Sequence, residues 1–121
     1  MTTTPDPRPT AVSVDGSHLL QGWRCRSCRL PLLWATPRCP GCGGSVEADT
    51  FGPGGTVWSS TVVRVPVPGR TPPYGMAYVD LDDGPRVLVH VAGPAERVAV
   101  GSRVRLLPPG EQGDVTVEEV R

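Results

Sequence analysis

Lysine, isoleucine and asparagine are absent from this 121-residue sequence, so all 12 basic residues are arginine. The codons of the three missing residues are AT-rich, and a GC-rich bacterial genome explains their absence without a functional demand. The use of arginine in place of lysine therefore does not by itself indicate bidentate ligand recognition. Because 12 acidic residues balance the arginines, no global charge draws the chain to nucleic acid or to an anionic membrane.

The sequence also lacks any run of about 18 apolar residues, the length that spans a bilayer as a helix. Residues 1–16 contain three prolines and no apolar run of signal-peptide length. We therefore expect a cytoplasmic protein whose thiols stay reduced. Residues 1–9, rich in Thr and Pro, are expected to be disordered, and residues 11–22 are too short and Gly-interrupted for a confident helix.

All four cysteines lie in two Cys-x-x-Cys pairs, Cys25 with Cys28 and Cys39 with Cys42, which ten residues separate. Each pair predicts a tight turn that presents two sulfurs, and four thiolates can surround one zinc ion tetrahedrally at about 2.3 Å. Two such pairs with no cysteine left over indicate a closed site with one structural Zn²⁺. The alternatives are two disulfides, free thiols, or iron in place of zinc, which would give a rubredoxin-like electron carrier. His18, seven residues before the first cysteine, is not expected to be a ligand.

The region around the cysteines has two further features. The apolar segment Leu30–Trp34 either covers the metal or presents Leu32, Leu33 and Trp34 to a partner. No acidic residue lies between residues 23 and 42, whereas four arginines do. These arginines can offset the thiolate charge, and they are then either solvated or turned toward an anionic partner: Arg24, Arg26, Arg29 and Arg38.

Beyond the breaker cluster at 52–55, the sequence is rich in valine and punctuated by glycine and proline. We predict strands at Thr56–Val65, Gly75–Leu81, Arg86–Val91, Arg103–Leu107 and Asp114–Val120. A hairpin turn is expected at 82–85, and residues 93–101 are expected to form a linker with room for one helical turn. Five short strands in about seventy residues fit a closed OB-type barrel better than a two-sheet sandwich.

The predicted fold class is therefore mainly β. A flexible N-terminal segment is expected over residues 1–20, followed by a rubredoxin-like zinc ribbon over 21–51 and a five-stranded OB-fold barrel over 52–121.

Several stretches occur together with the four cysteines. They are the knuckle Arg38–Gly43, the run Gly55–Val63, the proline loop ending at Tyr74, and Val79–Leu88. In this combination, from residue 22 to the C-terminus, the chain resembles the acyl-CoA-associated Zn-ribbon/OB-fold family, also known as domain of unknown function 35 (DUF35). Relatives commonly begin with a helical hairpin, for which residues 1–22 are too short here.

The resemblance implies a non-catalytic accessory subunit. Its partner would be a thiolase-superfamily enzyme, either a thiolase or a lipid-transfer-protein-like aldolase, or else a MaoC-like hydratase. Such partners act on acyl-CoA thioesters, including those of lipid and steroid side-chain metabolism, and supply the catalytic residues. On this hypothesis Leu30–Trp34 contacts the partner, and the proline loop lies beside the acyl-CoA. Arg64, Arg70 and Tyr74 are the CoA-proximal candidates, although exposed arginines are more often merely solvated.

The residues themselves also indicate no independent catalysis. A closed four-cysteine site is structural, because it leaves no open coordination position. His90 has no neighbouring motif partner and is expected to be a strand residue at solvent or an interface. Turn chemistry explains Asp82 and Asp83 better than a carboxylate site does.

The main alternative function is single-stranded nucleic-acid binding. Such proteins combine a positively charged groove with stacking aromatics. From Thr56 onward, however, seven arginines oppose eight acidic residues, and the aromatics are Trp58, Tyr74 and Tyr78. Nucleic acid is therefore not the expected partner.

Overall fold

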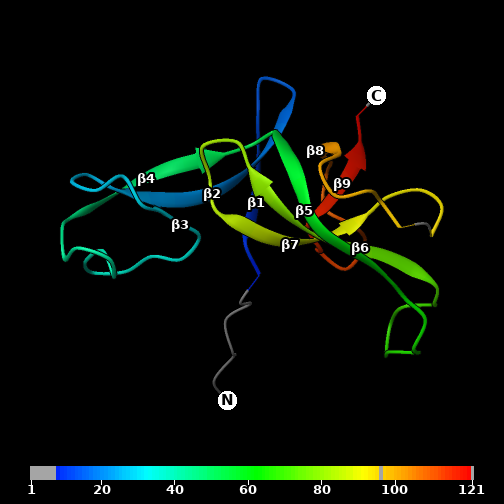
Figure 1. Ribbon diagram of the computed structural model, residues 1–121. Coiled ribbons are helices and arrows are strands. Elements are labelled where there is room, and N and C mark those ends of the chain that lie inside the picture. Colours follow the sequence, from blue (N-terminus) through cyan, green and yellow to red (C-terminus); the bar gives the residue numbers. More distant parts are fainter. Residues whose placement is uncertain (1–7, 96, 121) are drawn as a thin grey trace, which may run out of the picture.

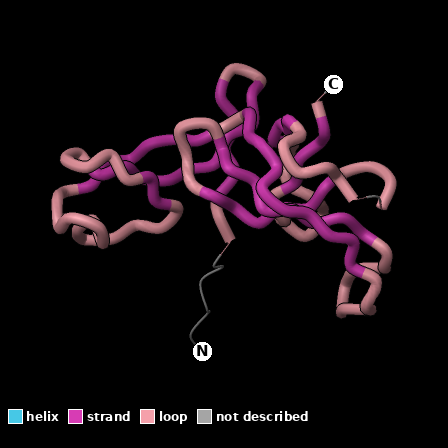
Figure 2. The backbone as a smooth tube through the Cα atoms, in the orientation of Figure 1, coloured by secondary structure: helices cyan, strands magenta, loops and turns pink. Residues whose placement is uncertain are grey.

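The computed structural model describes residues 8–95 and 97–120. Within these ranges the chain consists of nine strands and their connecting loops, without a helix (Figure 2). The described chain accordingly contains no helix long and apolar enough to cross a membrane. Of the segment 1–9, for which disorder was predicted, residues 1–7 lie outside the described residues.

The first part of the chain forms a four-stranded antiparallel sheet, here named the ribbon lobe (residues 10–51). Its strands are β1 (Thr10–Val14), β2 (Ser17–Cys25), β3 (Pro31–Leu32) and β4 (Val46–Phe51). β2 is central, since it pairs with each of the other three. β2 and β4 run outward from the rest of the molecule, and the cysteine-bearing loops lie at their far end (Figure 1).

The β1–β2 hairpin was not anticipated from the sequence. Asp15 and Gly16 form its two-residue turn, with left-handed φ angles of 49° and 80°. Asp-Gly is favoured at these positions because a tight primed turn requires positive φ at both residues. β2 also runs without a break across residue 20, so the predicted limit between segments 1–20 and 21–51 does not coincide with a strand boundary.

The second part of the chain forms a closed five-stranded barrel. Its strands are β5 (Gly54–Val63), β6 (Tyr74–Leu81), β7 (Arg86–Val91), β8 (Arg103–Leu106) and β9 (Thr116–Glu119). Their order around the barrel is β5-β6-β7-β9-β8, and β8 pairs back to β5. β7 and β9 are parallel, whereas the other pairs are antiparallel. The mainly β fold class with a five-stranded OB-like barrel is confirmed.

The predicted strands agree with the barrel strands to within two residues at each boundary, and Arg86–Val91 agrees at both ends. The helical turn expected within 93–101 is absent from the described residues of that segment, which form bends and a turn. Val98 from this segment is instead buried in the core.

Alternation of side chains along each strand fills the barrel with aliphatic residues. In β6, for example, Ala77, Val79 and Leu81 are buried while Tyr78 is exposed. The register between β5 and β6 shifts next to Trp58, whose side chain is exposed. The buried apolar residues from Gly54 onward are Val57, Ala77, Val79, Leu81, Val87, Val89, Val98, Val104, Leu106, Val115 and Val117.

Phe51, at the end of β4, joins the two parts of the molecule. It is 2% exposed and belongs, with Leu20 and Leu33, to the same apolar cluster as the barrel interior. A Cβ on Gly22 would lie 2.4 Å from the Phe51 ring, so only glycine allows this contact. The ribbon lobe and the barrel therefore share one continuous core.

Candidate metal centre

The four predicted ligands converge at the outer end of the ribbon lobe. Their Sγ atoms all lie within 4.8 Å of one another. The Sγ atoms of Cys25 and Cys42 are 3.5 Å apart, and those of Cys28 and Cys39 are 3.6 Å apart. Thiolates bound tetrahedrally at about 2.3 Å would be separated by about 3.8 Å. Four closely spaced thiols with this donor chemistry therefore fit one small metal ion, and the cluster, as it lies in the described residues, does not include His18.

The first cysteine pair lies in a turn that backbone hydrogen bonds close. The Cys25 N–H donates to the Leu30 carbonyl at 3.0 Å, and the Arg29 N–H donates to the Cys25 carbonyl at 3.1 Å. Arg29 takes a left-handed φ of 67° to complete this turn. The N–H groups of Ser27 and Cys28 each lie 3.4 Å from the Cys25 sulfur. Such donors stabilise an ionised thiolate.

The second cysteine pair repeats the same geometry. The Cys39 N–H donates to the Gly44 carbonyl at 2.8 Å, and the Gly43 N–H donates to the Cys39 carbonyl at 2.8 Å. Gly43 has a φ of 78°, and the Gly41 N–H lies 3.3 Å from the Cys39 sulfur. A Cβ on Gly44 would lie 3.1 Å from the Cys25 sulfur, so glycine lets the backbone pass close to the cluster. The two turns are thus equivalent halves of one site.

The thiols within the cluster differ in acidity. The Cys28 N–H, followed by weaker hydrogen bonds, lowers the pKa of the Cys25 thiol to about 6. The Leu30 N–H acts in the same direction on Cys28, but the hydrogen bond with Cys42 and desolvation outweigh it and raise the pKa of Cys28 to about 12. The four thiols therefore do not all ionise near neutral pH on their own, and binding of a cation would release protons.

The arginines beside the cysteines pair with oxygens of the ribbon lobe itself. Arg26 and Arg29 lie 3.8 Å and 3.3 Å from Glu47 on β4, and Arg38 donates to the Gly43 carbonyl at 3.2 Å. The sequence window around the cysteines contained no acid, but the antiparallel pairing of β2 with β4 brings Glu47 opposite Arg24. Arg26 and Arg29 thus do not act on the thiolate charge alone, because the carboxylate of Glu47 shares them.

Arg24 connects the metal centre to the barrel. Its Nε lies 2.8 Å from Asp49 Oδ2, and its Nη1 donates to the Arg29 carbonyl at 2.9 Å. Its Nη2 donates to the carbonyl of Asp83 in the β6–β7 turn, and its guanidinium lies 5.2 Å from the centre of the Phe51 ring. The hydrogen bond from Arg24 holds the pKa of Asp49 below its usual value. Sequence analysis did not assign this role, because the partners of Arg24 are far apart in the chain.

The apolar segment between the two cysteine pairs divides into residues with different environments. Leu33 is 6% exposed and packs in the shared core, while Leu32 on β3 is half-buried. Trp34 is 60% exposed, and Leu30 is 37% exposed. The structure therefore places Leu33 inside the fold and leaves Trp34 at the surface.

The predicted CoA-proximal residues lie between the end of β5 and the start of β6. Arg70 forms an ion pair with Asp114, and its guanidinium lies 5.2 Å from the centre of the Tyr74 ring. Arg70 and Tyr74 line one groove together with His90. Arg64 is exposed directly after β5.

His90 lies on a strand, as expected, but it is more enclosed than the solvent-facing position that was one of its two expected environments. Its side chain is 17% exposed, its Nε2 lies 3.8 Å from Asp114 Oδ1, and its Nδ1 is buried without a hydrogen-bond partner. Burial, followed by the charge of Arg70, lowers the pKa of His90. Asp114 was not singled out from the sequence because the pairing of β7 with β9 brings it to His90 only in the folded barrel.

Residues 48–107 match a family model described as the C-terminal OB-fold domain of ChsH2. The chain is also similar to a chain in the solved structure of the Ltp2–ChsH2(DUF35) aldolase, with 26% sequence identity and a TM-score of 0.68. That similarity covers 83% of this chain and 84% of the other, so it extends beyond the barrel into the ribbon lobe. Among curated protein sequences, none matches the chain.

Proposed function

Since residues 48–107 place the chain in the DUF35 family, through its ChsH2-type OB-fold domain, we propose that it is a non-catalytic accessory subunit of an aldolase-type enzyme. The observation that carries this proposal is the structural similarity to a chain of the Ltp2–ChsH2(DUF35) aldolase across both lobes. A similarity of that extent means that the two chains share a two-part architecture and not the barrel alone.

The proposed metal is one structural zinc ion held by Cys25, Cys28, Cys39 and Cys42. When bound, zinc would cross-link the two cysteine turns and supply no open position for a substrate. The small ribbon lobe buries few apolar side chains of its own, so such a cross-link would account for its folding. Iron is the alternative ion for four thiolates, and metal analysis of the purified protein distinguishes the two. Reduced thiols also favour the cytoplasm as the proposed compartment.

The described residues offer little support for independent catalysis. General base catalysis requires a base within hydrogen-bond reach of the proton it removes. The 3.8 Å separation of His90 and Asp114 exceeds a hydrogen bond, and Asp114 already pairs with Arg8 and Arg70. In the part of the chain that the structure describes, no Ser or Thr hydroxyl is hydrogen-bonded to His90. We therefore assign the catalytic residues to the partner enzyme.

The more specific form of the proposal names the partner and the shared ligand. The partner would be a thiolase or lipid-transfer-protein-like aldolase, with a MaoC-like hydratase as the alternative, acting on an acyl-CoA. The groove lined by Arg70, Tyr74 and His90 is the proposed acyl-CoA side of the barrel. Arg70 already pairs with Asp114, so a phosphate at this groove would compete with that carboxylate.

Nucleic-acid binding has less support from the charge distribution. Arg86, Arg103 and Arg105 form ion pairs with carboxylates on the barrel. Because single-strand binding relies on arginines and lysines that are free to meet phosphates, these arginines do not form a positive groove.

Co-expression of this chain with the product of the neighbouring gene tests the proposal. We expect one complex whose mass, measured by native mass spectrometry, corresponds to both polypeptides. We also expect no acyl-CoA turnover by this chain alone. The absence of any such complex, or turnover by the isolated chain, would contradict the accessory-subunit assignment.

A further inference from the structure

Three neighbouring strands of the barrel carry a surface of large apolar side chains. Along β6 the side chains of Met76 and Tyr78 share one face, and Leu88 on β7 is the cross-strand partner of Tyr78. Trp58 on β5 meets the Tyr78 ring edge-on, with 6.2 Å between the ring centres. Arg86 adjoins this group through its contact with Trp58. We name the surface formed by Trp58, Met76, Tyr78, Arg86 and Leu88 the aromatic face.

The aromatic face is exposed and carries no unbalanced charge. Trp58, Tyr78 and Leu88 are 51%, 43% and 47% exposed. Arg86 is held by Asp80 through two hydrogen bonds of 2.7 Å and 3.1 Å, so its charge is neutralised within the same surface. Trp, Tyr, Met and Arg are the residues enriched at the centres of protein–protein interfaces, where unpaired charges are depleted. The composition of this surface thus matches an interface core.

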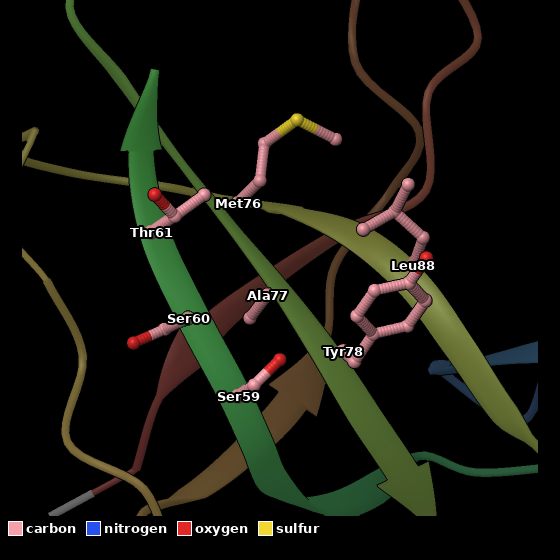
Figure 3. A pocket seen from close by; sticks show the side chains of 7 residues that line it. All are labelled: Ser59, Ser60, Thr61, Met76, Ala77, Tyr78 and Leu88. Atoms are coloured by element: carbon pink, nitrogen blue, oxygen red, sulfur yellow. The ribbon is translucent and has the colours of Figure 1, made fainter.

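A shallow hollow of about 110 Å³ lies within this surface, and Figure 3 shows the side chains around it. It is lined by Ser59, Ser60, Thr61, Met76, Ala77, Tyr78 and Leu88. Pockets for cofactors and other small molecules measure about 300–1,000 Å³, and a cavity of about 150 Å³ holds one benzene molecule. The hollow is therefore too small for an acyl-CoA or a cofactor but suits one apolar side chain.

The geometry around Trp58 argues against single-stranded nucleic acid as the occupant. The Arg86 guanidinium lies 3.8 Å from the centre of the indole ring and so covers one side of it. A stacked base needs a free aromatic face and nearby cations for its phosphate. Here the nearest cation already covers the ring and is paired with Asp80.

We infer that the aromatic face is the surface on which the barrel binds its partner subunit, with one apolar side chain of that subunit inserted in the hollow beside Tyr78 and Leu88. The inference rests on the proposed function, which supplies a protein partner, and adds the surface and the chemistry of the contact. The hollow takes the anchoring side chain, while Trp58 and Met76 exclude water around it.

The test uses the 121-residue chain and the thiolase-like, aldolase-like or hydratase-like enzyme that co-purifies with it. Leu88→Glu places a charge in the hollow, Tyr78→Ala removes one wall, and Val120→Glu is the matched control. Val120 is 44% exposed and lies beyond β9. We expect Leu88→Glu and Tyr78→Ala each to weaken binding at least about tenfold in calorimetry, and Val120→Glu to change it less than about threefold. Thermal unfolding of each variant, with a midpoint near that of the unmodified chain, verifies that the binding change is not a folding defect.

The outcomes separate this inference from the proposed function. If the complex forms and both aromatic-face variants bind as tightly as the unmodified chain, the proposed function stands and the docking surface is wrong. If the unmodified chain binds no such enzyme, both fail. If sedimentation shows that the unmodified chain is a dimer and Leu88→Glu a monomer, the occupant is a second copy and the inference is overturned. Binding of a fluorescent oligothymidine at low salt that Leu88→Glu abolishes would overturn it in favour of nucleic acid.

Discussion

The ribbon lobe and the barrel differ in what holds each of them together. Among the described residues, the barrel buries a continuous set of Val, Leu and Ala side chains, whereas the ribbon lobe adds Leu20, Leu33 and Phe51 together with two of its cysteines. A lobe of this size cannot bury enough apolar surface to fold by packing alone. The barrel is thus expected to depend on its core and the ribbon lobe on its metal, while Phe51 and Arg24 join the two.

Metal removal should have the largest effect, and it should act on the ribbon lobe far more than on the barrel. Chelation, or the double substitution Cys39→Ser/Cys42→Ser, removes the cross-link between the two cysteine turns. We expect amide protons of residues 25–45 to lose their protection from exchange, because the backbone of this region has little other support. Hydrogen exchange measured by mass spectrometry should show that β6 and β7 remain protected.

Equal loss of protection from hydrogen exchange in both lobes would contradict this prediction, because it would mean that the metal supports the barrel as well. Full protection of residues 25–45 in the metal-free protein would show that the ribbon lobe folds without its ion. Metal content, measured by atomic spectroscopy in the same samples, is the necessary control.

Phe51→Ala should produce the next largest effect, because this ring belongs to the core of both lobes. Truncation of a buried phenylalanine costs about 3–5 kcal/mol, and we expect a loss of that size in denaturant unfolding of the metal-bound protein. Phe51→Leu, which keeps most of the apolar volume, should cost less than half as much. An effect of Phe51→Ala below about 1 kcal/mol would show that the lobes do not share a core.

Arg24→Met should have a smaller effect on stability but a specific effect on coupling. The substitution removes hydrogen bonds to Asp49 and to the carbonyls of Arg29 and Asp83, and we expect a loss of about 1–3 kcal/mol. Metal removal is expected to lower the free energy of unfolding of the barrel only slightly in the unmodified protein, and it should lower it still less in this variant. Denaturant unfolding with and without chelator measures this coupling as a double-mutant cycle.

Arg26→Met is the matched control for that cycle. Arg26 is 62% exposed and lies 3.8 Å from Glu47, so its removal should change stability by less than about 1 kcal/mol. Equal effects of the two substitutions would rule out a special role for Arg24 between the lobes.

The contribution of His90 to the pH dependence of stability should be the smallest effect and should act on the barrel. The pKa of His90 is lowered in the fold by burial and by Arg70, so the folded state binds fewer protons than the unfolded state. This contribution to stability is present above the unfolded pKa of about 6.5 and is lost as the pH falls through the lower folded value. His90→Gln should flatten the pH dependence of the unfolding midpoint in this window. Asp49→Asn should alter that pH dependence only below about pH 4, because Arg24 lowers the pKa of the Asp49 carboxyl in the fold.

The parts of the fold that sequence analysis predicted correctly depend on neighbouring residues. The spacing of Cys25, Cys28, Cys39 and Cys42 predicted their convergence, since each pair closes its own turn. Valine-rich runs between glycines and prolines predicted the five barrel strands. The β1–β2 hairpin was also encoded locally, in the Asp15–Gly16 turn between alternating residues, and this signal was missed.

The remaining features depend on residues far apart in the chain. The hollow and the aromatic face require side chains from β5, β6 and β7 in the observed register, among them Trp58, Tyr78 and Leu88 in the aromatic face. The alternation in β6 and β7 contained part of this signal, because Tyr78 and Leu88 lie between buried residues. The register shift that exposes Trp58 follows only from the pairing of β5 with β6.

The amino-acid sequence by itself determined the four-cysteine cluster and the strand content, because thiol spacing, turn residues and side-chain alternation act over a few residues. Only the tertiary structure decided which distant groups meet: Arg24 with Asp83, Arg70 with Asp114, and Tyr78 with Leu88. Sheet register and barrel closure set these contacts, and both depend on the packing of the whole chain.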